Sequence, residues 1–323
     1  RRCIQILFSW MSLICIYQTM RNFFSRSNLL LILASIIWGC AFVAQNVGMN
    51  YIGPWTFSTI RFLIAGFSLL AIIPILDKKR THVIRPKTKE EKQKLLLGSV
   101  LCGLALSVGS IVQQIAMLTV PVAKAGFLTT LYVLFVPIIT LLFGKKIPLK
   151  VWVGIAMALF GLYLLSMAGN LALGIGEIFL ILAAFLFAIH IIIIGHFSTR
   201  VDPVRLSCGQ LLIGGFATVI PMIVIERPTI ASILAAYIPL LYTGIFSSCV
   251  AYTLQIFAQK EANPTIAGML LSLESVFAAL AGYLILNQVL NTRELIGCVL
   301  IFIAIVIAQL PDRRDMVNVT KET

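Results

Sequence analysis

Residues 175–195 read IGEIFLILAAFLFAIHIIIIG, an apolar run in which Glu177 is the only charged side chain. A segment of about 20 apolar residues is long enough to cross the hydrocarbon core of a bilayer as an α-helix. The run lacks the alternation of polar and apolar residues that marks the strands of a membrane barrel. This stretch therefore predicts a transmembrane helix.

The same pattern continues in both directions along the chain. Apolar runs of similar length are separated by short connections that are rich in glycine, proline and charge. The predicted helices cover residues 29–52, 54–76, 95–119, 121–143, 149–169, 175–195, 203–225, 237–259, 264–286 and 293–311. Helices joined by such short connections must be antiparallel neighbours. The expected fold class is an all-α integral membrane protein with about ten transmembrane helices.

The composition excludes a soluble fold. The chain is 60% hydrophobic and only 11% charged, and its mean hydropathy is +1.01, whereas soluble domains carry about 25% charged residues. The seven cysteines all lie in apolar stretches without CxxC spacing, a pattern that suggests neither a disulfide framework nor a metal site. No cofactor is predicted.

The positive net charge of +13 is explained by the positions of the basic residues. With ten helices, nineteen lysines and arginines fall on the side of the N-terminus, and only Lys124, Arg227 and Arg293 fall on the other side. Cytoplasmic loops carry the excess of basic residues in membrane proteins. We therefore predict a multi-pass protein of the cell (inner) membrane with both termini in the cytoplasm, and no nucleic-acid partner is needed to explain the charge.

An internal repeat relates the two halves of the chain. Residues 58–67 (STIRFLIAGF) match residues 207–216 (SCGQLLIGGF) at an offset of 149, with five of the ten positions identical. At an offset of 142, Gln113 meets Gln255, and Ala125-Gly126 meets Ala267-Gly268. Each copy has five helices, an odd number, so the second copy must enter the membrane from the opposite side. The expected architecture is two inverted five-helix repeats.

The repeat sets the expected division of the chain. The two five-helix repeats are predicted at residues 20–170 and 171–311, and residues 312–323 form a cytoplasmic tail. Residues 1–19 contain an apolar run, Ile4 to Tyr17, that is too short to span a bilayer easily. We expect residues 1–19 to be a non-native or upstream leader before a natural start at Met20.

Two stretches resemble a known family. Residues 264–280 (PTIAGMLLSLESVFAAL) resemble the signature end of the EamA family in the drug/metabolite transporter superfamily, although that family usually has Glu-Pro where this chain has Glu274-Ser275. Residues 34–42 (ASIIWGCAF) resemble its first-helix motif, and Arg61 matches its second-helix arginine. The resemblance covers roughly residues 29–311. It implies a secondary transporter of small metabolites, amino acids or drug-like compounds that works by alternating access, with export (efflux) favoured over import.

Glu274 is the clearest candidate for a transport role. It lies roughly 15 Å from the cytoplasmic end of its helix at 1.5 Å per residue, which is mid-membrane, where an ionisable side chain is costly unless it has a function. Its repeat counterpart is Tyr132, so both side chains should face one central cavity. Because burial favours the neutral form of a carboxyl group, Glu274 is a candidate proton carrier. The alternative is a neutral or hydrogen-bonded carboxyl that helps to pack the bundle.

Other polar and aromatic residues in the helices have both functional and structural interpretations. Arg61, whose counterpart is neutral Gln210, either attracts an anionic group such as a substrate carboxylate, braces an external gate, or bonds loop carbonyls. Amides such as Gln113 bind substrate or join helices, and the aromatic side chains line the cavity or pack. The candidate substrate-binding residues are Glu274, Tyr132, Trp38, Arg61, Gln113, Gln255, Tyr252 and His190.

Enzyme motifs are absent from the sequence. It contains no Gly-x-Ser-x-Gly, no His-Glu-x-x-His and no Gly-rich phosphate loop, so we predict neither an enzyme nor an ATP-driven pump. The expected partners are a small-molecule substrate, protons and the lipid bilayer. An uncoupled facilitator or channel and an intramembrane enzyme remain open as alternatives, as do the substrate, the coupling ion and the oligomeric state.

Overall fold

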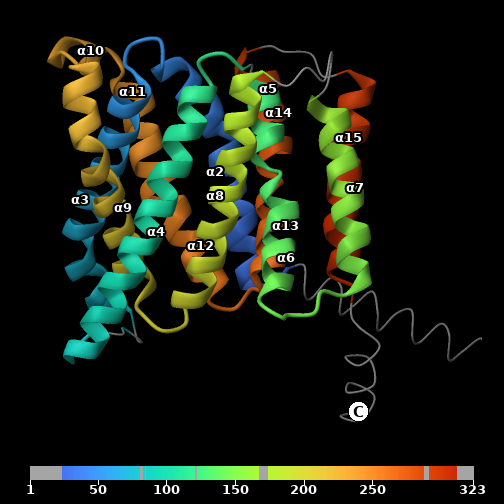
Figure 1. The fold of residues 1–323 in the computed structure, drawn as a ribbon, viewed down its shortest axis with the longest axis horizontal. Helices are drawn as coiled ribbons and strands as arrows, with labels where there is room; N and C mark the ends of the chain where they lie inside the picture. The colour runs from blue at the N-terminus through green and yellow to red at the C-terminus, as the bar shows by residue number, and fades with distance from the viewer. Residues whose placement is uncertain are drawn as a thin grey trace, which may run out of the picture.

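The computed structural model describes residues 24–80, 83, 85–120, 122–166, 174–286 and 291–310, and all regular structure in these residues is helical (Figure 1). The α-helices are α2 (Arg26–Gly48), α3 (Pro54–Lys79), α4 (Lys89–Ala116), α5 (Val122–Thr129), α6 (Tyr132–Leu142), α7 (Leu149–Ser166), α8 (Ile175–Phe197), α9 (Pro203–Pro221), α10 (Ile230–Ala235), α11 (Tyr237–Leu241), α12 (Tyr252–Gln259), α13 (Pro264–Leu271), α14 (Glu274–Leu286) and α15 (Thr292–Ala308). Two π-helical segments, η1 (Met222–Glu226) and η2 (Tyr242–Ala251), continue α9 and α11. The predicted leader and tail lie outside the described residues.

The helices have the length and surface of membrane spans. Eight segments of the described chain are long and apolar enough to cross a bilayer, and a ninth, Leu149–Leu164 in α7, is apolar but shorter. Large apolar side chains point away from the bundle, including Leu142, Ile220 and Leu284, which are 81%, 72% and 74% exposed. Such a surface is stable only in lipid. The all-α, multi-pass membrane class is confirmed, while the expected number of ten spans stays a prediction.

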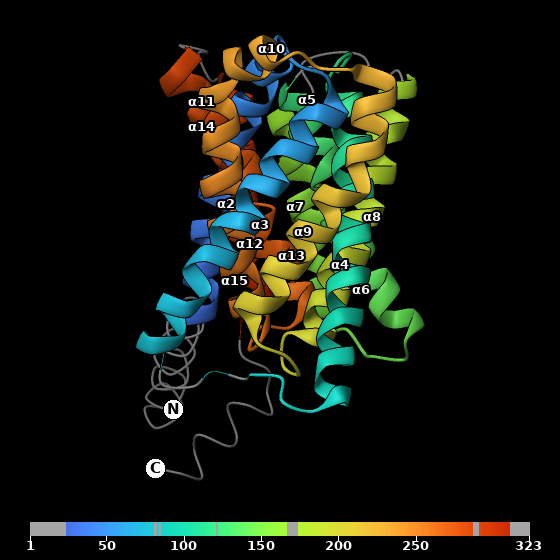
Figure 2. The same cartoon turned by 90° about the vertical axis from the view of Figure 1, so that its left-hand side faces the viewer.

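The helices pack as a bundle in which neighbours run side by side along most of their length (Figures 1 and 2). α3 packs along α9, and α4 packs against both α8 and α9. α2 contacts η2, α12 and α14, while α7 packs along α15 at one side of the bundle. Small residues allow the closest approaches: a Cβ on Gly161 of α7 would lie 2.8 Å from the carbonyl oxygen of Gly297 in α15.

The first and last described helices begin and end at the same end of the bundle. Asn28 in the first turn of α2 donates its Nδ2 hydrogen to Oε1 of Gln309, directly after α15, at 2.8 Å. Both side chains are buried. The described chain therefore enters and leaves the bundle on one side.

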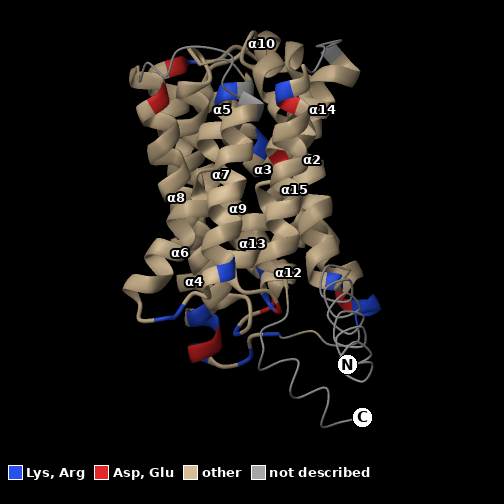
Figure 3. Ribbon diagram, turned by 90° about the vertical axis from the view of Figure 1, so that its right-hand side faces the viewer, with Lys and Arg blue, Asp and Glu red and all other residues tan. Residues whose placement is uncertain are grey.

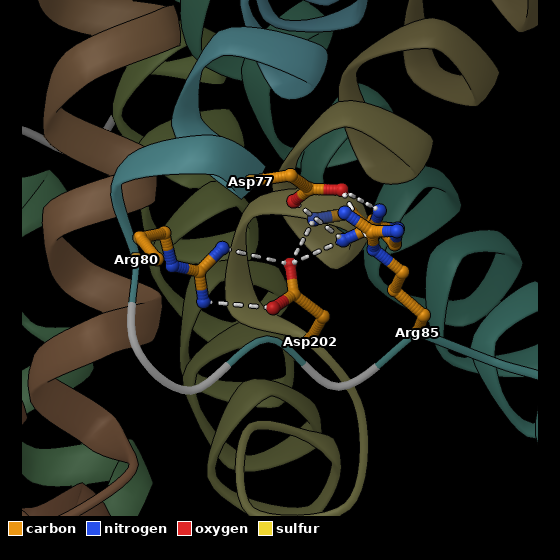
Figure 4. A network of polar contacts seen from close by, with 5 residues as sticks. Asp77, Arg80, Arg85 and Asp202 are labelled. Atoms are coloured by element: carbon orange, nitrogen blue, oxygen red, sulfur yellow. Dashed lines mark hydrogen bonds and ion pairs between the residues drawn. The ribbon is translucent and has the colours of Figure 1, made fainter.

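A network of ion pairs joins α3 to α9 at this end (Figure 4). Asp77, in the last turn of α3, accepts from Nη2 of Arg205 at 2.5 Å and lies 3.2 Å from Nε of Arg85. Asp202, the N-cap of α9, accepts from Nη2 of Arg80 at 2.7 Å and from the backbone N–H of Arg205 at 3.1 Å. We call these five residues the basic-end network, because the lysines and arginines of the described chain gather at this end (Figure 3).

A second carboxylate joins the same two helices at the opposite end. Glu226, the last residue of η1, accepts from the backbone N–H groups of Trp55 and Thr56 at 2.9 and 2.7 Å, and from the Thr56 hydroxyl at 2.6 Å. Its carboxylate satisfies donors in the first turn of α3 that have no partner within the helix. α3 and α9 are therefore held together by acidic side chains at both ends.

Candidate functional site

Two helices are interrupted at corresponding positions inside the bundle. α5 stops before Thr130-Leu131 and α6 follows, and α13 stops before Ser272-Leu273 and α14 follows; the two breaks are related by the repeat offset of 142. Neither break contains proline or glycine. The hydroxyls of Thr130 and Ser272 each donate to the carbonyl three residues earlier, at 2.8 and 2.7 Å. Interrupted helices near the midplane are where transporters place substrate and ion sites.

Tyr132 and Glu274 are the first residues after these breaks, and they meet. The Tyr132 hydroxyl donates to Oε1 of Glu274 at 3.0 Å, and the two residues are 4% and 5% exposed. Beside them, the hydroxyls of Ser275 and Thr130 lie 3.2 Å apart and link the two interrupted helices. The breaks therefore place the carboxyl group and its hydroxyl partner together in the interior.

The Tyr132–Glu274 pair lies on the wall of a cavity of about 60 Å³. The lining residues are Trp38, Phe42, Gln45, Arg61, Gln113, Thr129, Tyr132, Phe187, His190, Ile191, Ser247, Tyr252, Gln255, Leu271 and Glu274. All eight candidate residues from the sequence lie on this wall. Small-molecule sites usually measure about 300–1,000 Å³, so the cavity is contracted and must widen to hold a metabolite.

Arg61 is the only lysine or arginine on this wall. It lies in α3, is 3% exposed, and donates from Nη1 to Oε1 of Gln45 at 3.3 Å. The guanidinium lies over the ring of Phe62, 4.7 Å from its centroid, a favourable cation–π distance. Within the described chain Arg61 forms no ion pair, and Glu274, the only acidic residue lining the cavity, accepts instead from Tyr132.

Aromatic side chains fix one wall of the cavity. The Trp38 indole N–H donates to the carbonyl of Ser247 at 2.9 Å, and its ring lies 4.9 Å from that of Tyr252. The His190 ring meets the Tyr252 ring edge-on at 5.8 Å, and its Nε2 lies 2.9 Å from Oε1 of Gln210. Ser247 belongs to the π-helical segment η2, a geometry that is frequent at functional sites.

The two glutamines of the sequence repeat differ in their bonding. Gln113 donates from Nε2 to the Thr129 hydroxyl at 3.1 Å, so it ties α4 to the end of α5. Gln255 is 1% exposed, and its Oε1 has no hydrogen-bond partner among the described residues. A buried acceptor without a partner is costly, and this oxygen is available to a donor on a bound solute.

Seven lining residues were not among the candidates: Phe42, Gln45, Thr129, Phe187, Ile191, Ser247 and Leu271. Gln45 and Thr129 could have been predicted from the sequence, because each is a polar residue within an otherwise apolar helix. The apolar lining residues could not, since every face of a membrane helix is largely apolar. The described residues contain no cluster of three or more histidine, cysteine or acidic side chains that could hold a metal ion.

Comparisons with known proteins identify the family of the chain. The EamA-like transporter family model matches residues 25–167 and 174–309. An uncharacterized transporter of Archaeoglobus fulgidus is 30% identical over 88% of this chain and 86% of its own length, and the inner membrane transporter YedA of Escherichia coli is 27% identical over 85% and 88%. A solved crystal structure that is 19% identical superimposes with a TM-score of 0.72, covering 89% of this chain and 98% of its own. The chain belongs to the EamA-like transporter family.

Proposed function

We propose that this protein is a secondary transporter of a small organic solute, which binds in the central cavity between two inverted five-helix repeats. The hydrogen bond between Tyr132 and Glu274, at two facing helix breaks beside the cavity, carries the proposal. The pair puts an ionisable group inside the bundle, where it is costly and therefore supports a transport role.

The packing of the helices supports the inverted repeat. If the two halves are related by symmetry, each contact in one half should have an equivalent in the other. The contact of α4 with α8 corresponds to that of η2 and α12 with α2, and the contact of α6 with α8 corresponds to that of α14 with α2. All of these contacts are present. The family match also falls into two successive ranges. With α7 and α15 counted as spans, the repeats are residues 20–170 and 171–311, and ten helices return the chain to its starting side.

Alternating access follows from two repeats that move relative to one another around a shared site. The α3–α9 pair is tied at one end by the basic-end network and at the other by Glu226. We assign the contracted cavity to a conformation that must widen before a solute binds. An uncoupled channel would instead need a continuous path.

Proton coupling is assigned to Glu274. Its carboxyl group is 5% exposed and has one hydroxyl donor, Tyr132, so neutralisation by a proton is the simplest way to lower the cost of its charge when the cavity closes. The basic residues gathered at one end orient the chain with both termini in the cytoplasm. Export of a solute in exchange for protons is the direction we propose.

A flux experiment tests the proposal. Purified protein is first screened by thermal unfolding against amino acids, nucleosides and cationic drugs, because a bound ligand stabilises the folded state. Each binder is then measured in proteoliposomes with and without an imposed pH gradient. We expect the gradient to drive accumulation by the wild type, Glu274→Gln to retain counterflow but lose pH dependence, and Glu90→Gln, an exposed carboxylate on α4, to behave as wild type.

The outcomes separate the rival functions. Flux that is identical with and without the gradient in the wild type would identify an uncoupled facilitator. If the solute flux of Glu274→Gln still depends on the pH gradient, Glu274 is not the proton carrier. Binding without any flux would overturn the transporter proposal itself.

A further inference from the structure

Arg61 is a buried cation whose charge is not neutralised by the described protein. It is 3% exposed, and no carboxylate of the described chain lies within ion-pair distance, although Arg80, Arg85 and Arg205 all have such partners. Its contacts include a neutral amide, Gln45, and the rings of Phe57 and Phe62, whose centroids lie 5.9 and 4.7 Å from the guanidinium carbon. Burying a charge is costly unless it is paired, so a buried charge without a pair among the described residues points to a partner that arrives from outside.

The hydrogen-bonding pattern of the guanidinium shows where that partner would bind. A guanidinium has five N–H donors in a fixed fork, and Arg61 uses one of its nitrogens, Nη1, to donate to Gln45. Nε is buried without a hydrogen-bond partner, and the only hydrogen bond of the guanidinium to a described residue is the one from Nη1. Nε and Nη2 form one edge of the fork, which matches the two oxygens of a carboxylate.

The corresponding position in the other repeat is neutral. Gln210, at an offset of 149 from Arg61, is fully buried and pairs with His190 at 2.9 Å. The positive charge is therefore a feature of one side of the cavity and is not a requirement of the shared helix packing. The cavity that Arg61 and Glu274 line also has an aromatic wall, formed by Trp38 and Tyr252, whose rings lie 4.9 Å apart.

We propose that Arg61, oriented by Gln45, is an anion subsite and that the transported solute is a small organic carboxylate. Its carboxylate docks on the Nε–Nη2 edge when the cavity widens, and its apolar body packs on the aromatic wall. This inference rests on the proposed transport function and narrows its substrate class. Nucleosides and cationic drugs, which lack a carboxylate, are then not substrates.

Paired ligands test the subsite. Benzoate, phenylacetate, hexanoate and N-acetyl-leucine are each compared with the corresponding neutral carboxamide, by thermal unfolding and by competition in detergent. We expect at least one carboxylate to bind about tenfold or more tightly than its amide, a difference that corresponds to about 1.4 kcal/mol. Arg61→Gln should remove that preference by weakening carboxylate binding, while the amide still binds. Arg61→Lys should keep part of it, because the charge stays while the bidentate edge is lost.

Arg227→Gln is the matched control, since Arg227 is exposed and lies outside the cavity. It should leave both affinities unchanged. Equal binding of carboxylates and amides, a carboxylate preference that survives in Arg61→Gln, or no stabilisation by any carboxylate would each overturn the anion subsite. Gel filtration and the retained amide binding show whether Arg61→Gln is folded. Carboxylates that bind through Arg61 but are not moved by wild-type proteoliposomes would instead refute transport alone.

Discussion

Tyr132 and Glu274 occupy the same position in the two halves of the chain and contact each other directly at 3.0 Å. Each residue is therefore the hydrogen-bond partner of the other. Because the hydroxyl donates to the carboxyl group, replacing either residue removes the same interaction. We expect Tyr132→Phe and Glu274→Gln to be non-additive in a double-mutant cycle, with a coupling of about 0.5–3 kcal/mol in the free energy of unfolding. Titration with SDS from mixed micelles measures it.

Tyr283 provides the matched control for this cycle. It is on α14, the helix that begins at Glu274, but it is 48% exposed on the outer surface. Tyr283→Phe should combine additively with Glu274→Gln. A coupling of the same size for both tyrosines would show that the effect comes from the helix as a whole and not from the hydrogen bond.

At the scale of single residues, the sequence was informative where polarity is rare. Glu274 and Arg61 were identifiable because an ionisable residue within an apolar helix is costly, and both line the cavity. Ser247 was not identifiable: its contribution is a backbone carbonyl that accepts from Trp38, within a π-helical segment that changes the rotation of the residues after it. Whether these residues bind solute stays a prediction.

The interrupted helices show that a break does not need proline. The family usually has proline where this chain has Ser275, yet α13 and α14 are separate, and the Ser272 hydroxyl bonds the carbonyl of Met269. Ser275 is the second residue of α14, and the first turn of a helix tolerates proline. Proline at this position removes both the hydroxyl bond to Thr130 and the bond from the Ser275 backbone N–H to the Ser272 carbonyl at 3.2 Å. We therefore expect Ser275→Pro to lower the free energy of unfolding by about 2 kcal/mol, the value of two hydrogen bonds.

Leu280→Pro is the comparison variant for Ser275→Pro. Leu280 lies in the middle of α14 and is 39% exposed, so its replacement tests the helix backbone with little change in packing. Proline inside a helix costs about 3 kcal/mol or more. Thermal unfolding in detergent should place Ser275→Pro between the wild type and Leu280→Pro. A large loss for Ser275→Pro would mean that α13 and α14 act as one continuous helix.

The polar contacts that join α3 to α9 follow the sequence repeat. Asp77 and Glu226 are related by the offset of 149, and so are their partners Thr56 and Arg205, so the same two positions are bonded at both ends of the helix pair. If the repeats rock about the cavity, opening one side must release one carboxylate and keep the other. Asp77→Asn should therefore favour opening at the basic end, and Glu226→Gln should favour opening at the opposite end.

Accessibility of the cavity from each side measures this bias. In a cysteine-free background, Ser247→Cys places one thiol on the cavity wall. A charge-assisted hydrogen bond is worth about 1.5–3 kcal/mol, so each variant should change the rate of labelling by a membrane-impermeant maleimide by about tenfold. The two variants should act from opposite sides. Faster labelling from the same side in both would contradict the assignment of these carboxylates to opposite gates.

At the scale of helices, the apolar runs predicted nearly every element. The predicted segment 203–225, for example, corresponds to α9 and η1, which end at Glu226. The breaks after Thr129 and Leu271 were missed because serine, threonine and leucine are all ordinary in a membrane helix. The pairing of Asp77 with Arg205 was also missed, because charged residues at helix ends look like boundary residues until the partner helix is placed beside them.

At the scale of the whole molecule, the start of α2 and the end of α15 lie on the same side of the bundle, because Asn28 donates a hydrogen bond to Gln309. An even number of spans is required for this, and from the excess of basic residues we predict that this side faces the cytoplasm. Single cysteines at Arg26 and Leu310, in a cysteine-free background, should react with an impermeant maleimide only after cells are permeabilised. A cysteine at Arg227, beyond the other end of α9, should react in intact cells. Because inverted repeats of five helices each require ten crossings, labelling of the Arg26 and Leu310 positions from opposite sides would exclude the inverted repeat of five helices.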